Sequence, residues 1–181
     1  MNPFSKKGTL SSLKCSCTNI RSLSTTVPGA TRAKITRILD LKCDLNILID
    51  TRTSIEDVEK IFLNHKMKWK LAQFKHIGTY SKQKGIIIFF RPNVVQIKDL
   101  QIIVNGQLVN FKAKANNDWV NFTTMYAPSD EDDPYFMLKA KSELDKLDGD
   151  LSLMCGDFNT HLMSNTIESV TPLTLTESAE V

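Results

Sequence analysis

Long apolar runs and a secretion signal are both missing from this 181-residue sequence. No segment has the run of about 18 apolar residues that a membrane-spanning helix needs, and the N-terminus lacks the apolar core of a signal peptide. Cysteine is sparse, with only Cys15 and Cys17 close together, besides Cys43 and Cys155. One C-x-C pair is a weak metal signal, so we interpret all four as reduced thiols in strands or core. These features favour an intracellular protein, nuclear or cytoplasmic.

Acidic residues are missing from two long segments, although the formal net charge of the chain is only +3. Residues 1–39 and residues 60–84 each carry seven Lys or Arg and no Asp or Glu. In the second segment the lysines alternate with Trp69, Phe74 and Tyr80, a mixture that can follow a nucleic-acid backbone. The alternative is a solvated basic face beside ordinary core aromatics. The acid-free N-terminus has the composition of a transit peptide, but a predicted first strand argues against one.

The length of the chain permits one domain with a hydrophobic core, and no internal repeat divides it. Residues 1–12 read as a disordered lead-in and residues 13–162 as the domain. Residues 163–181, rich in Ser, Thr and Glu, read as an irregular tail.

Apolar spacing predicts a mixture of strands and helices. Strands are expected at 13–20, 45–49, 85–90, 94–104, 107–114, 119–126 and 151–157, and helices at about 31–41, 54–63 and 134–147. The first helix lies between two strands, and such a β-α-β unit gives two parallel neighbours. The middle strands read as antiparallel. The predicted fold class is therefore α/β (α+β), with helices covering a largely antiparallel core.

Polar side chains stand at the ends of several predicted strands. Asn19, Asp50 and Tyr126 each lie at the end of one, and Asp157 and Asn159 follow the last. Residues two apart on an extended segment point the same way, so the last two place a carboxylate beside a carboxamide. Such a pair can hold a hard cation or orient a water or phosphate. The structural alternative is a set of Asx-rich turns and a core tyrosine with a satisfied hydroxyl.

The order of these residues resembles the endonuclease/exonuclease/phosphatase superfamily, and most closely the endonuclease domain of non-LTR (LINE-type) retrotransposons. The match spans roughly residues 13–162, and its pieces are Thr18–Leu23, Ile47–Arg52, Lys82–Ile88, Met125–Pro128 and Gly156–Asn159. The last two pieces are the specific ones. The resemblance implies a two-sheet α/β sandwich, with mixed sheets, outer helices and an active site at one rim. It also implies cleavage of DNA phosphodiesters with Mg²⁺ or Mn²⁺.

The resemblance further implies a role for each site residue. Asp50 and Asn19 would bind the metal, although the family usually has a glutamate where this chain has Asp50. Tyr126 would donate a hydrogen bond to the scissile phosphate. Asp157 would orient or deprotonate the attacking water, and Asn159 would contact the phosphate and position Asp157. The basic residues expected to contact DNA are Arg21, Lys82 and Lys84.

The closing motifs of the family, a further aspartate and a Ser-Asp-His or Asp-His pair, have no counterpart in residues 160–181. His161 follows Asn159 too closely for that role, and His65 and His76 read as surface residues. We therefore expect the last strands of the sandwich to be missing, with weak or absent activity and a protein partner at the incomplete sheet edge. Whether the chain is an enzyme stays open. Alternatives are a non-catalytic nucleic-acid-binding or interaction module, and a phosphatase-type member acting on a small phosphoester.

Overall fold

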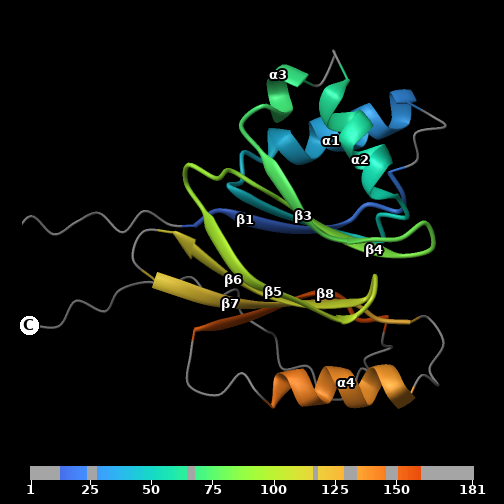
Figure 1. Cartoon of the computed structure of the whole chain (residues 1–181), viewed down its shortest axis with the longest axis vertical. Coiled ribbons are helices and arrows are strands. Elements are labelled where there is room, and N and C mark those ends of the chain that lie inside the picture. The colour runs from blue at the N-terminus through green and yellow to red at the C-terminus, as the bar shows by residue number, and fades with distance from the viewer. Residues whose placement is uncertain are drawn as a thin grey trace, which may run out of the picture.

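A computed structural model describes residues 13–23, 28–64, 68–115, 118–128, 134–145 and 151–159. The predicted lead-in (1–12) and tail (163–181) lie outside these residues, as does His161. The described part of the chain forms two sheets that pack face to face, with helices on their outer faces (Figure 1). The predicted two-sheet sandwich with outer helices is therefore confirmed.

The first sheet contains a parallel pair and two antiparallel pairs. Its strands are β1 (Cys15–Asn19), β2 (Leu45–Ile49), β3 (Lys75–Tyr80) and β4 (Gly85–Phe90), in the order β1-β2-β4-β3. β1 and β2 are parallel, as the β-α-β pattern predicts. The helices on its outer face are α1 (Pro28–Asp40), α2 (Ile55–Leu63) and α3 (Lys68–Leu71) (Figure 1).

Local sequence accounts for two helix starts in this half of the molecule. α1 begins at Pro28, earlier than predicted, because proline has a helical φ and its missing N–H is not needed in the first turn. Ser54 precedes α2, and its Oγ accepts a hydrogen bond from the Asp57 N–H at 3.3 Å. Ser54 is therefore the N-cap of this helix.

The second sheet is antiparallel except for its last pair. Its strands are β5 (Gln96–Val104), β6 (Leu108–Ala115), β7 (Asp118–Tyr126) and β8 (Ser152–Asp157), in sequence order across the sheet. β7 and β8 are parallel, and α4 (Pro134–Leu144) lies on the outer face (Figure 1). Among the described strands, β1 and β8 are edge strands of their sheets.

Three apolar layers hold this four-layer arrangement together. One lies between the first sheet and its helices, one between the two sheets, and one between the second sheet and α4. Between the sheets, the rings of Phe111 and Phe122 stack with centroids 5.0 Å apart. None of the described helices has the length and apolar character needed to cross a membrane.

The lysine-rich segment differs from its sequence-based description. It contains α3 and β3, which apolar spacing did not predict. Trp69 is 84% exposed, but Phe74 is buried and Tyr80 half-buried, so two of the three aromatics belong to the core. His76 is also half-buried rather than on the surface, and its ring packs against Phe62. His65 lies outside the described residues.

Candidate functional site

The C-terminal ends of four strands meet at one rim of the sandwich. Within each parallel pair both strands end on the same side, so Asn19 on β1 comes near Asp50 after β2, and Tyr126 lies opposite Asp157 in the β7–β8 register. Asn19 Nδ2 then donates to Asp157 Oδ2 at 2.7 Å. This hydrogen bond joins the two sheets and brings strand ends from distant parts of the sequence into one site.

The loop after β8 fixes the second carboxylate oxygen of Asp157. The Asn159 N–H donates to Asp157 Oδ1 at 3.2 Å, from a residue with φ of 42°. Asn159 Nδ2 donates to the carbonyl of Ala127 at 2.7 Å, and the Ala127 N–H donates to the Asp157 carbonyl at 2.8 Å. The carboxylate and carboxamide predicted to act together are thus in one network, with Asn159 holding Asp157 through its backbone.

The loop after β1 has an unusual backbone that a lysine supports. Arg21 and Ser22 have φ of 47° and 77°, values that side chains other than glycine disfavour. Lys34 on α1 places Nζ within 2.7–2.8 Å of the carbonyl oxygens of Ile20, Arg21 and Ser22. The ammonium therefore satisfies three successive carbonyls. The Arg21 N–H donates to Asn19 Oδ1 at 3.2 Å, which fixes the other end of that amide.

Asp50 is held by a neighbouring arginine. Arg52 Nε donates to Asp50 Oδ1 at 2.7 Å, and a terminal guanidinium nitrogen donates to Oδ2 at 3.0 Å. The Asp50 side chain is only 3% exposed, whereas that of Arg52 is 50% exposed. Hydrogen bonds to Asp50 and then to Tyr126 raise the pKa of Arg52 above its usual value. The guanidinium is therefore charged and links Asp50 to the tyrosine predicted to contact phosphate.

The donor set at this rim does not fit a divalent cation as it is arranged. Such ions prefer carboxylate and carbonyl oxygens, but the Arg52 guanidinium binds both oxygens of Asp50. Arg52 also places a positive charge against Asp50. Among the described residues, no group of three His, Cys, Asp or Glu is close enough to hold a metal. The assignment of Asp50 and Asn19 as metal ligands stays a prediction.

The three basic residues predicted to contact DNA lie on loops at this same rim. The Ser22 N–H donates to the Asp50 carbonyl at 2.8 Å, which brings the loop of Arg21 beside the site. A β-bridge between Thr53 and Ser81 brings the turn that carries Lys82 and Lys84 beside the site as well. Arg21 and Lys82 are exposed and Lys84 is half-buried.

Two thiols lie next to the Asn19–Asp157 pair, on the same strands β1 and β8. Cys17 and Cys155 each precede a member of that pair by two residues, so their side chains share its faces of β1 and β8. The interaction between the Cys17 and Cys155 thiols raises the pKa of Cys17 and lowers that of Cys155. All four cysteines are free, as predicted, although Cys15 and Cys17 are exposed.

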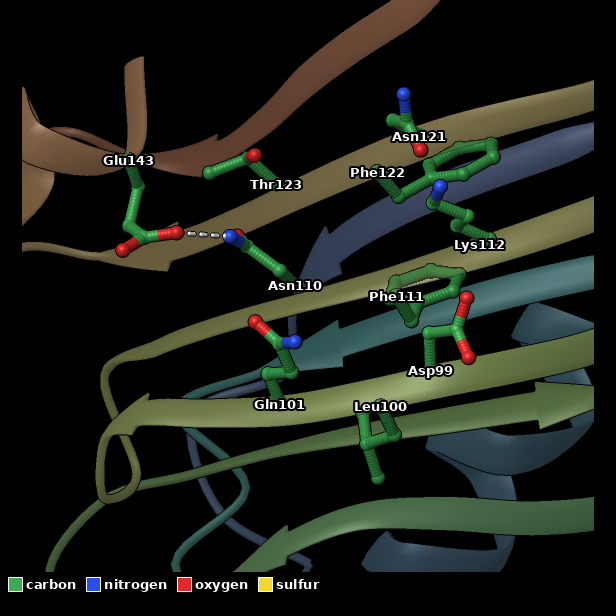
Figure 2. A pocket seen from close by; sticks show the side chains of 10 residues that line it. All are labelled: Asp99, Leu100, Gln101, Asn110, Phe111, Lys112, Asn121, Phe122, Thr123 and Glu143. Carbon is green, nitrogen blue, oxygen red and sulfur yellow. Dashed lines mark hydrogen bonds between the residues drawn. The ribbon is translucent and has the colours of Figure 1, made fainter. Parts of the chain in front are cut away.

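A separate hollow of about 510 Å³ lies on the outer face of the second sheet near α4 (Figure 2). Its lining includes the carboxylates of Asp99 and Glu143, and Glu143 accepts a hydrogen bond from Asn110. None of the predicted site residues lines it. The two carboxylates outnumber the one basic side chain in the lining, Lys112, which disfavours a phosphate there, so the rim remains the candidate site.

Sequence reasoning missed two residues that shape this rim. Arg52 lies inside a segment that carried the family resemblance, but its bond to Asp50 depends on φ of 55° and 45° at the two residues. No spacing rule reveals that bend. Lys34 reads as one of several basic residues on α1, and its role appears only once the helix is docked.

Comparison with solved structures finds the same two-sheet sandwich in other proteins. A humanized D. rerio TDP2 matches with TM-score 0.63 and 14% identity, over 82% of this chain and 63% of the other. D. rerio TDP2 with a single-strand DNA product matches with TM-score 0.60 and 14% identity, over 82% and 61%. The endonuclease domain of TRAS1, a telomere-specific non-LTR retrotransposon, matches with TM-score 0.57 and 8% identity, over 81% and 60%.

These structures share the fold but little sequence, and the chain spans about three fifths of their length. No protein-family model and no curated protein sequence matches the chain. Its two mixed sheets and outer helices agree with the expectation from the sequence. The chain therefore has the α/β sandwich fold of the endonuclease/exonuclease/phosphatase superfamily.

Proposed function

We propose that this chain is a DNA-engaging domain of endonuclease type and retrotransposon origin that cleaves phosphodiesters weakly or not at all. The observation that carries the proposal is the Asn19–Asp157 hydrogen bond, which assembles strand ends from both sheets into one polar rim. Two comparisons support the substrate class: one TDP2 structure holds a single-strand DNA product, and the TRAS1 protein is an endonuclease domain.

Each rim residue has a chemical role in this proposal. Tyr126 donates a hydrogen bond to a phosphate oxygen, Asp157 orients a water, and Asn159 keeps Asp157 in place. Phosphodiester cleavage builds negative charge on the phosphate, and stabilising that charge supplies much of the rate. Because Asp50 is bonded to Arg52, Mg²⁺ or Mn²⁺ finds no ready position, and we expect turnover to be weak or absent.

Nicking of supercoiled plasmid tests the catalytic part of the proposal. The wild-type chain and Asp157→Ala would be compared in Mg²⁺, in Mn²⁺ and in excess EDTA. We expect little or no nicking by either protein in any buffer. Efficient metal-dependent nicking that Asp157→Ala removes would refute the proposed weak or absent turnover.

DNA binding tests the remaining part. Fluorescence anisotropy of a labelled single-stranded oligonucleotide should show binding that weakens as salt is added, because phosphate contacts release counterions. A chain that leaves the anisotropy unchanged would refute the proposal.

A non-catalytic nucleic-acid-binding module is the second candidate, and the Asp50–Arg52 ion pair favours it. Both candidates bind DNA and predict little or no nicking, so weak metal-dependent nicking that Asp157→Ala removes would favour the first candidate. Metal-dependent release of phosphate from a small phosphomonoester, without DNA binding, would instead indicate a phosphatase-type member.

A further inference from the structure

Arg52 is held in place by the residue predicted to bind the metal. Asp50 and Arg52 are both in the left-handed region, with φ of 55° and 45°, and this bend turns the guanidinium back onto the carboxylate. The carboxylate is almost fully buried and would lack a charged partner without Arg52. A buried charge is strongly disfavoured unless it is paired, so the pair is a fixed part of the site.

The Arg52 side chain is half exposed and lies beside Asp50 at the rim where phosphate is proposed to bind. Two of the five guanidinium N–H donors bond Asp50, and the side chain also contacts Tyr126. The loops of Arg21 and of Lys82 and Lys84 lie on either side. An arginine anchored in this way presents its remaining donors with little further loss of side-chain freedom.

From this geometry we infer that Arg52 occupies the place of a divalent cation and binds a DNA phosphodiester directly, with no metal. The inference rests on the proposed function, since it names the group through which the rim holds DNA. A planar guanidinium suits phosphate oxygens because its donors lie in one plane. Asp50 offsets the charge of Arg52, so Arg52 supplies directed hydrogen bonds. Longer-range attraction comes from Arg21, Lys82 and Lys84.

Removing the charge of Asp157 should change DNA affinity in opposite directions at a site with a metal and at a site without one. If a metal bridged Asp157 and phosphate, Asp157→Asn would weaken DNA binding. With Arg52 alone, the charge of Asp157 repels phosphate, so Asp157→Asn should tighten binding. Asp157→Asn also keeps an oxygen to accept from Asn19 Nδ2, which preserves the link between the sheets.

Fluorescence anisotropy of a labelled single-stranded oligonucleotide, in excess EDTA and in Mg²⁺, tests the inference. We expect equal affinity in the two buffers when their ionic strength is matched, because added salt alone weakens phosphate contacts. Arg52→Lys should weaken binding about tenfold because it loses the planar donors. Arg52→Ala would leave the buried Asp50 carboxylate without a charged partner. We therefore remove both charges with the double variant Asp50→Asn/Arg52→Gln, which should also weaken binding. The matched control is Arg91→Gln, which alters the Arg91–Asp44 pair, 3.1 Å long, away from the rim.

The outcomes separate the inference from the proposed function. Folded Arg52 variants that bind as tightly as wild type, or affinity that rises in Mg²⁺ and loses that rise in Asp50→Asn, would overturn the inference alone. A wild-type chain that binds no DNA in either buffer would overturn both. Equal affinity in EDTA and Mg²⁺, together with loss in the Arg52 variants and gain in Asp157→Asn, supports the inference.

Discussion

Asn19 Nδ2 lies 2.7 Å from Asp157 Oδ2, and the two residues belong to different sheets. Replacing Asn19 by alanine leaves this carboxylate oxygen without its donor. A hydrogen bond to a charged group contributes about 1.5–3 kcal/mol, and water can reach this partly exposed pair. We therefore expect Asn19→Ala to lower the free energy of unfolding by about 1.5 kcal/mol, measured by urea denaturation.

The variant Asn19→Asp is the matched control for that hydrogen bond. It keeps the size of the side chain but sets one carboxylate against another. The loss of stability should exceed that of Asn19→Ala at neutral pH. It should shrink at acidic pH, because one of the two carboxylates takes up a proton. An equal loss at both pH values would contradict the contact.

Gly156 is predicted to tolerate no side chain. Its φ is 154°, and an added Cβ would collide with the carbonyl of Met125 on the neighbouring strand. Gly156→Ala should therefore cost about 3 kcal/mol or more and separate β8 from β7. Gly29→Ala on α1 is the control, since nothing lies within 4 Å of its added Cβ. Thermal unfolding that is equally affected by both variants would contradict this account.

His76 should make the stability of the chain depend on pH. Burial lowers its pKa below 6.5, with Glu59 acting weakly in the opposite direction. The unfolded chain therefore takes up a proton near pH 6.5 more readily than the folded one, and stability falls as pH decreases through that value. In His76→Phe, which keeps the aromatic contact with Phe62, the loss between about pH 7.5 and 5.5 should be smaller. The same dependence of unfolding free energy on pH in His76→Phe as in the wild-type chain would contradict this role of His76.

Cys17 and Cys155 are predicted to form a disulfide under oxidised glutathione. One thiol, after losing its proton, attacks the glutathione disulfide and releases one glutathione. The second thiol displaces the other, so two thiols become one disulfide and two glutathione thiols form. Non-reducing peptide mapping should find the Cys17–Cys155 link, and Cys43→Ser should leave it intact. A Cys15–Cys155 link in the wild-type chain would show that the contact is not the one described.

Most of the strands could be predicted because buried strands have apolar runs, as at Ile86–Phe90. β3 could not, because Lys75 and His76 belong to a lysine-rich segment and the strand is defined by its pairing with β4. The convergence of Asn19 and Asp157 was implied by family resemblance. The Asp50–Arg52 pair was not, because it depends on backbone angles that residue spacing does not encode.

The three hydrogen bonds from Lys34 make the loop at the rim sensitive to chemical modification of a side chain on α1. Because one ammonium holds three successive carbonyls beside Asn19, neutralising that amine by acylation would remove its charge and leave one N–H donor for the three carbonyls. The shape of the loop at the rim is therefore controlled by the charge of a single side chain on α1.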